Sequence, residues 1–149
     1  MLSLYSSYYI KVPSKKIIMI NLKRAKRGVT GLIIAILILT VLEFPAPIGF
    51  ETRPQDNVSM LWLIFFLIIL LTEVAVIPLI FKRPRLGIKF AFVAAVLNIL
   101  QIFADQFHLM QPEVAPLSYA LIEYSVGIMA LALIYFAWRI YRFVNHGDS

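Results

Sequence analysis

Four long apolar segments, separated by short polar connections, make up most of this chain. They cover residues 29–50, 58–81, 86–107 and 116–144, and the polar tails are residues 1–28 and 145–149. At 1.5 Å per residue, a helix of each length crosses the hydrocarbon core of a bilayer, which is about 30 Å thick. Open strands would leave backbone groups unpaired in lipid. The pattern therefore predicts an all-α, polytopic membrane protein built as a four-transmembrane-helix bundle.

The first tail and the first span allow more than one interpretation. We expect residues 1–28 to be a disordered basic tail; a surface helix around Ile17–Ile20 and a translation start at Met19 are the alternatives. The first apolar run also has the length of a signal-peptide core. However, Pro45 and Pro47 stand where a small-residue cleavage motif belongs, so we expect an uncleaved span.

Composition agrees with lipid surroundings. Hydrophobic residues make up 61% of the 149 residues, and the mean hydropathy is +0.86. Soluble domains are only about 45–50% apolar. The chain has no cysteine, which excludes disulfides, thiolate metal sites and thiol chemistry.

The basic residues give the bundle an orientation. With four spans, thirteen of the fourteen Lys and Arg residues fall on one side of the membrane and only Arg53 falls on the other. The positive-inside rule then places both termini in the cytoplasm, N-in and C-in, in a plasma or inner membrane. The net charge of +6 is thereby explained without a nucleic-acid partner. Tyr135, Trp138, Tyr141 and Trp62 lie near span ends and suit interfacial aromatic belts.

Each span carries one carboxylic acid: Glu43, Glu73, Asp105 and Glu123. An ionisable group in hydrocarbon costs at least about 2.5–3.5 kcal/mol. Acids facing lipid without partners would therefore destabilise the bundle strongly. We expect all four to lie on the inner faces of the helices.

The third span carries a polar stripe. Asn98, Gln101, Asp105 and His108 are spaced by three, four and three residues, which places them on one face of a helix. Ala91, Ala94 and Ala95 continue near this face toward the cytoplasm, where small residues allow close helix packing.

Counting residues along each span places these groups at different depths. Glu43, Gln101, Asp105 and Glu123 share a layer near the outer surface, and Asn98 lies near the middle of the membrane. Tyr119 is one turn from Glu123. His108 either caps the layer or is an ordinary interfacial residue.

Glu73 is predicted to lie apart from that layer, in the inner half of the second span. Its expected partners are basic or phenolic groups that reach in from the cytoplasmic boundary, namely Arg139, Lys89 or Tyr135.

The outer layer predicts a polar pocket or proton-handling site that opens to the outside. Interhelical hydrogen bonds made only for packing are the alternative, but they contribute only about 0.6 kcal/mol each. Asp105 and His108 have the spacing of a metal-ligand pair, yet a di-iron bundle needs two Glu-x-x-His motifs. We therefore predict no metal. No phosphate-binding glycine loop or nucleophile elbow is present.

The chain resembles DoxX-like proteins, a family of small four-helix membrane proteins. The resemblance lies in Leu71-Thr72-Glu73, in the basic turn Lys82-Arg83-Pro84-Arg85-Leu86-Gly87, and in the Asp105/His108 pair, over about the last 120 residues. It implies an association with quinone-linked respiratory oxidoreductases. A looser likeness is to emopamil-binding, sterol-isomerase bundles.

Three functions therefore stay open. The leading one is a small-ligand site for a quinone or lipid, or a membrane subunit of a redox complex. The second is an enzyme that transfers protons on a lipid-soluble substrate, with Glu123 or Asp105 as acid/base and His108 as relay. The third is a structural partner for other membrane subunits or for further copies of the chain.

Overall fold

The structure is a computed structural model that describes residues 15–43, 59–109 and 116–146, with side chains from residue 22 to residue 142 within these ranges. The described residues form four helices and no strand: α1 (Lys15–Leu42), α2 (Met60–Lys82), α3 (Pro84–Gln106) and α4 (Leu117–His146). Each contains a stretch long and apolar enough to cross a membrane. The predicted all-α membrane bundle is confirmed for this part of the chain.

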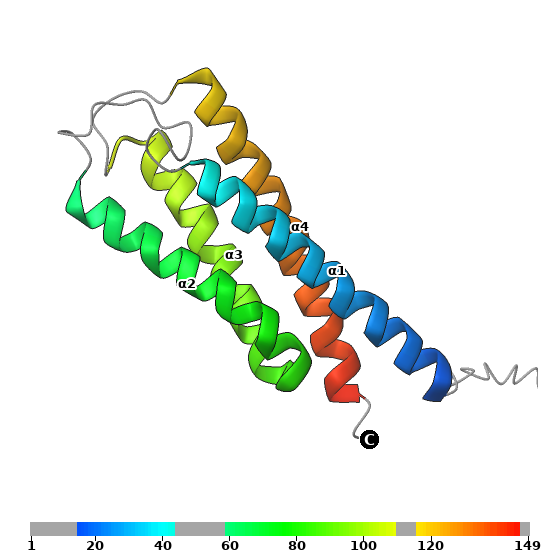
Figure 1. The fold of residues 1–149 in the computed structure, drawn as a ribbon. Coiled ribbons are helices and arrows are strands. Elements are labelled where there is room, and N and C mark those ends of the chain that lie inside the picture. Colours follow the sequence, from blue (N-terminus) through cyan, green and yellow to red (C-terminus); the bar gives the residue numbers. More distant parts are fainter. Residues whose placement is uncertain (1–14, 44–58, 110–115, 147–149) are drawn as a thin grey trace, which may run out of the picture.

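The helices surround a common interior in the order of the chain. α2 packs against α3, α3 against α4, and α4 against α1, while α1 and α2 close the bundle with the loosest packing. Neighbouring helices run antiparallel (Figure 1). Each helix therefore turns one face toward the interior and another outward, and the outward faces carry Leu, Ile, Val, Phe and aromatic side chains.

Helix boundaries differ most from prediction in α1. This helix begins at Lys15 and continues without a break into the apolar span from Leu22 to Leu42, so half of the predicted tail is helical. Lys, Arg, Leu and Ala are good helix formers, and no proline interrupts this segment. The part of the first predicted span from residue 44 to residue 50 lies outside the described residues.

The buried positions of α1, α2 and α4 follow a regular alternation of four and three residues, and α3 adds further buried positions to the same pattern. In α4 they are Tyr119, Glu123, Val126, Ala130, Leu133, Ala137 and Ile140. A spacing that averages 3.5 residues is typical of coiled-coil packing. Glu43, Glu73, Asp105 and Glu123 all occupy buried positions, with at most 3% of each residue exposed. The predicted inward placement of the four acids is confirmed.

The turn between α2 and α3 is a very close one. Arg83 alone separates the two helices, and Pro84 begins α3 at a position where its missing N–H is not needed. One turn further on, a Cβ atom on Gly87 would stand 2.5 Å from the backbone of Ile80. Glycine therefore sets the distance between the two helices.

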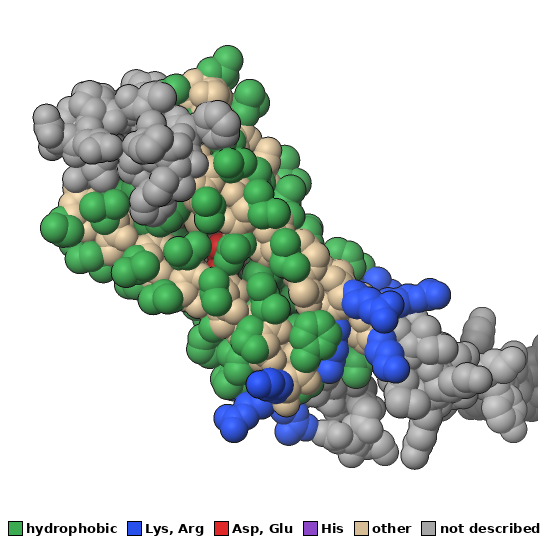
Figure 2. All heavy atoms as spheres, in the orientation of Figure 1, with side chains coloured by type: hydrophobic (Ala, Val, Ile, Leu, Met, Phe, Trp, Pro, Cys, Tyr) green, Lys and Arg blue, Asp and Glu red, His purple; other side chains and the backbone are tan. Residues whose placement is uncertain are grey.

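The two halves of the bundle differ in chemistry. We call the end that carries Lys and Arg side chains the basic end, and Figure 2 shows these side chains gathered there. The described members are Lys23, Arg24, Lys26, Arg27, Lys82, Arg83, Arg85, Lys89, Arg139 and Arg142. Toward this end the interior is apolar, built from residues such as Val29, Ile80, Ala91 and Ile140. The predicted alanine face of the third helix is buried here.

Candidate functional site: a buried carboxyl cluster

The buried polar side chains all lie between the middle of the bundle and the end opposite the basic end. They are Thr40, Glu43, Glu73, Asn98, Gln101, Asp105 and Glu123. They come from all four helices or their ends, so the polar groups from different helices converge. This half of the interior is where we look for a functional site.

α1 ends before the far end of the bundle, and this places Glu43 in the interior. α1 stops at Leu42, and the Glu43 N–H still bonds the Leu39 carbonyl at 3.0 Å. In Figure 1 this end of α1 stops short of the corresponding ends of the other three helices. The carboxyl group therefore sits at a helix end inside the bundle, rather than at the membrane surface.

Glu43, Asp105 and Glu123 come together with two amide side chains. We call this group, with Gln101 and Gln106, the carboxyl cluster. Gln101 Nε2 donates to Glu43 Oε2 at 3.4 Å, and Gln106 Nε2 donates to Glu123 Oε2 at 2.7 Å. Glu123 also lies within hydrogen-bonding reach of Asp105 and within electrostatic reach of Glu43. Three helices, α1, α3 and α4, thus supply three acids to one site.

A second polar group lies one helical turn closer to the basic end. Asn98 Nδ2 donates to Glu73 Oε1 at 2.7 Å and to the Ala94 carbonyl at 2.9 Å. Thr40 lies beside the Glu73 carboxyl, although its hydroxyl makes no hydrogen bond of good geometry there. We call Thr40, Glu73 and Asn98 the middle layer.

The predicted partners of Glu73 are wrong. Tyr135 is exposed on the outer surface, and Lys89 and Arg139 are exposed at the basic end. The error has a geometric cause, because side chains lean toward the N-terminus of their own helix. In antiparallel helices, Glu73 on α2 and Asn98 on α3 therefore lean toward each other, which counting along Cα positions does not capture.

His108 stays outside the carboxyl cluster. Its side chain is exposed, and its backbone has a φ of 54° just after α3 ends. The His108 N–H bonds the Asp105 carbonyl at 2.9 Å, and the Leu109 N–H bonds the Ala104 carbonyl at 2.8 Å. These are the two bonds of a Schellman motif, so His108 terminates the helix.

Two aromatic residues of this half are buried. Tyr119 is completely buried one turn before Glu123, as the sequence spacing predicts. Trp62 is 1% exposed and stacks on Phe66 in the interior. The assignment of Trp62 to an interfacial belt is therefore wrong. Tyr135, Trp138 and Tyr141 do lie on the exterior of the bundle.

Among the described residues, several buried oxygens in the two polar groups have no hydrogen-bond partner of good geometry. They include Oε1 of Glu123, Oε2 of Glu73 and Oε1 of Gln101. Leaving a buried polar atom unsatisfied costs about 1–3 kcal/mol. The carboxyl cluster therefore presents amide donors and carboxyl acceptors to a ligand.

Sequence reasoning missed Gln106, Thr40 and Tyr124. Gln106 lies about 100° around α3 from the predicted stripe, on the side that meets α4, and it accepts from Tyr124 at 3.4 Å. Thr40 is one turn before Glu43, a spacing that predicts a shared face. Among the described residues, no group of three or more His, Asp or Glu side chains is placed to hold a metal ion.

The fold and the cluster define a class: a multi-pass helical membrane bundle with acids buried in one half of its interior. Searches against protein-family models, characterised proteins and solved structures found no match to this chain.

Proposed function

We propose that this chain is a plasma-membrane or inner-membrane protein, N-in and C-in, that binds the headgroup of a quinone-class molecule at the carboxyl cluster. The single observation that supports this function is the convergence of Glu43, Asp105 and Glu123 with two amides inside an apolar bundle. A protonated carboxyl donates to a quinone carbonyl, and a carboxylate accepts from a quinol hydroxyl. The same cluster therefore suits both forms of such a ligand.

The arrangement of the interior favours a one-sided site over a channel. Polar side chains extend from the cluster only as far as the middle layer, and beyond Glu73 the core toward the basic end is apolar. A proton or ion would find no polar partner along that half. Ligand and protons thus reach the cluster from the end opposite the basic end or from the lipid.

A lateral route from the lipid between α1 and α2 would suit an apolar ligand. α1 and α2 form the loosest contact of the bundle. On the face shown in Figure 2, acidic atoms are visible at one point between these two helices. This seam would admit a lipid-soluble molecule, and membership of a redox complex would supply its electrons.

The two tryptophans allow a direct test with decylubiquinone as probe. Trp62 is buried in the half that holds the cluster and Trp138 lies toward the basic end, so Trp138→Phe and Trp62→Phe proteins report on different places. We expect saturable quenching of Trp62 fluorescence. We expect the affinity to fall at least tenfold in Glu123→Leu and Asp105→Leu.

Matched controls keep this test decisive. Ser125→Ala changes a residue two positions from Glu123 whose hydroxyl bonds only its own helix, at 2.8 Å to the Leu121 carbonyl, and it should bind as the unsubstituted protein does. Glu123→Gln keeps an acceptor for Gln106 and so protects the fold. Quenching that is unsaturable, or equal in all variants, would overturn the proposed site and favour a purely structural role.

A further inference from the structure

A second, separate feature lies on the exterior of the bundle, toward the basic end. α3 and α4 border a hollow of about 450 Å³, which we call the α3/α4 groove. Its walls are Ile88, Phe92 and Val93 of α3 and Ala137, Trp138 and Tyr141 of α4. Its volume falls within the range of about 300–1,000 Å³ that is usual for small-molecule sites. None of its residues belongs to the carboxyl cluster.

In a membrane, the groove would lie near the depth where lipid headgroups meet acyl chains. Lys89 is five residues from the start of α3 at Pro84, and Tyr141 directly precedes the end of the apolar span of α4 at Arg142. Tyr and Trp side chains are typical of this interfacial depth. The walls are apolar except at the rim, so an acyl chain fits the hollow by its chemistry.

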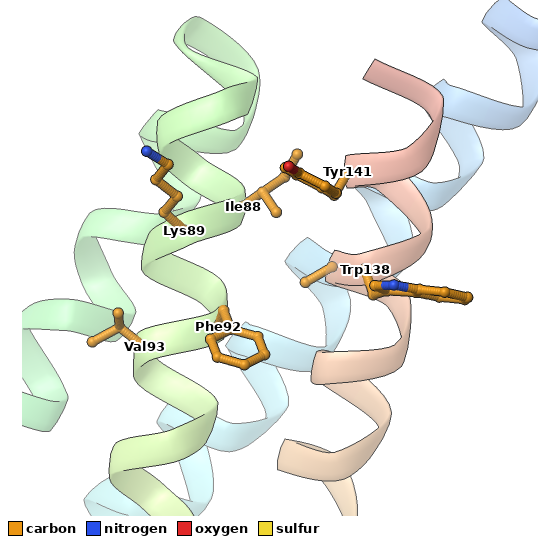
Figure 3. A pocket seen from close by; sticks show the side chains of 7 residues that line it. Ile88, Lys89, Phe92, Val93, Trp138 and Tyr141 are labelled. Atoms are coloured by element: carbon orange, nitrogen blue, oxygen red, sulfur yellow. The ribbon is translucent and has the colours of Figure 1, made fainter. Parts of the chain in front are cut away.

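Positive charge lies near the groove on both helices. Lys89 borders the groove on α3, and its ammonium group points toward the basic end (Figure 3). On α4 the Arg142 guanidinium lies 4.0 Å above the Trp138 ring. Among the described residues, the buried acids lie in the other half of the bundle, except Glu73 in the middle layer. This charge pattern is complementary to a phosphate group.

We propose that the α3/α4 groove binds an anionic phospholipid, with an acyl chain in the hollow and the phosphate at the basic rim that Lys89 and Arg142 supply. The inference does not depend on the quinone site, because it uses other residues at another depth. Arg142 is held in place by its contact with Trp138, so less side-chain freedom is lost when it pairs with the headgroup.

Brominated lipids test the proposal, because bromine quenches a tryptophan only at close range. The Trp62→Phe protein retains Trp138 as its sole tryptophan. In vesicles that mix phosphatidylglycerol and phosphatidylcholine, either lipid is supplied in brominated form. We expect brominated phosphatidylglycerol to quench Trp138 more than its mole fraction predicts, which corresponds to a several-fold preference. Lys89→Gln with Arg142→Gln should reduce the preference to about one.

Two further variants distinguish specific binding in the groove from general attraction to a charged surface. Lys82→Gln with Arg83→Gln removes the same charge from the same end but leaves the groove intact, and it should keep most of the preference. Val93→Phe fills the hollow and keeps both rim charges, and it should lower the preference several-fold. Circular dichroism verifies the fold of each variant.

Three results would overturn the proposal. They are an equal response to both lipids in the Trp62→Phe protein, an equal loss of preference in the control pair, and an unchanged preference in Val93→Phe. The second would show that only the diffuse charge of the basic end attracts anionic lipid, and the third that no acyl chain occupies the hollow.

Discussion

Glu73 is completely buried near the middle of α2, and its hydrogen bond of good geometry comes from one donor, the Asn98 side chain. That donor is itself held by the Ala94 carbonyl, which fixes its direction. In lipid, no water is present at this depth to form hydrogen bonds with a carboxyl group. The energy of the pair therefore depends on both members being present, and removing one is worse than removing both.

A double-mutant cycle at this pair tests that dependence. Asn98→Leu should lower the free energy of unfolding by about 1–3 kcal/mol, because it leaves a buried acceptor without its donor. Glu73→Leu combined with Asn98→Leu should recover most of that loss, since neither polar group then remains. Unfolding in mixed micelles, followed by circular dichroism, gives both values.

Thr72→Ala is the matched control for this cycle. The Thr72 hydroxyl bonds only its own helix, at 2.7 Å to the Ile68 carbonyl, and the residue is adjacent to Glu73. Its substitution should change stability by less than about 0.5 kcal/mol. If the two single losses at Glu73 and Asn98 simply added, the pair would carry no coupling and the middle layer would be incidental.

A left-handed residue at the end of α3 gives a second test at the residue scale. For a residue other than glycine, this conformation costs roughly 1–2 kcal/mol. His108→Gly should therefore raise the free energy of unfolding by about 1 kcal/mol, measured by the same unfolding assay. Because the His108 side chain is exposed, decylubiquinone binding should not change. A loss of binding would show that the His108 side chain contributes to the ligand site.

At the scale of elements, the tight pairing of α2 and α3 depends on Gly87. The two helices are separated by Arg83 alone, so they cannot shift apart without disturbing the turn. This hairpin also carries both members of the Glu73–Asn98 pair. The spacing of α2 and α3 at the basic end therefore sets how closely Glu73 and Asn98 can approach each other.

Gly87→Ala should be strongly destabilising for an alanine substitution. The added Cβ meets the Ile80 backbone at 2.5 Å, and overpacking of this kind costs about 1–3 kcal/mol. Gly31→Ala is the control, because nothing lies within 4 Å of a Cβ there, and removing a glycine from a helix should stabilise it by roughly 0.5–1 kcal/mol. Equal effects in the unfolding assay would show that the hairpin adjusts freely.

Helical periodicity and depth account for most of what the sequence predicts about these elements. They identify four spans, the inward faces of the acids and the meeting of Glu43, Gln101, Asp105 and Glu123. They fail where side-chain direction or helix length decides, as for the Glu73 partner, for Gln106 and for the start of α1. Trp62 shows a further limit, because position near a span end does not reveal which way a ring points.

At the scale of the whole molecule, the two ends of the bundle differ in charge and in the polarity of their interior. One end carries the described Lys and Arg residues around an apolar core. The buried acids described lie in the middle layer or in the other half. Thirteen of fourteen basic residues on one side would place the basic end in the cytoplasm. The carboxyl cluster would then lie toward the outer surface, where protons and ligands arrive from outside the cell.

Because the chain has no cysteine, single cysteines can test this orientation without other changes. Ser118→Cys lies at the start of α4, opposite the basic end, and His146→Cys is the last residue of the same helix. A membrane-impermeant maleimide should label Ser118→Cys on intact cells but label His146→Cys only after permeabilisation. The reverse pattern would place the basic residues outside and the carboxyl cluster near the cytoplasm. It would contradict the proposed outward access, while the contacts within the cluster and the α3/α4 groove would stay as they are.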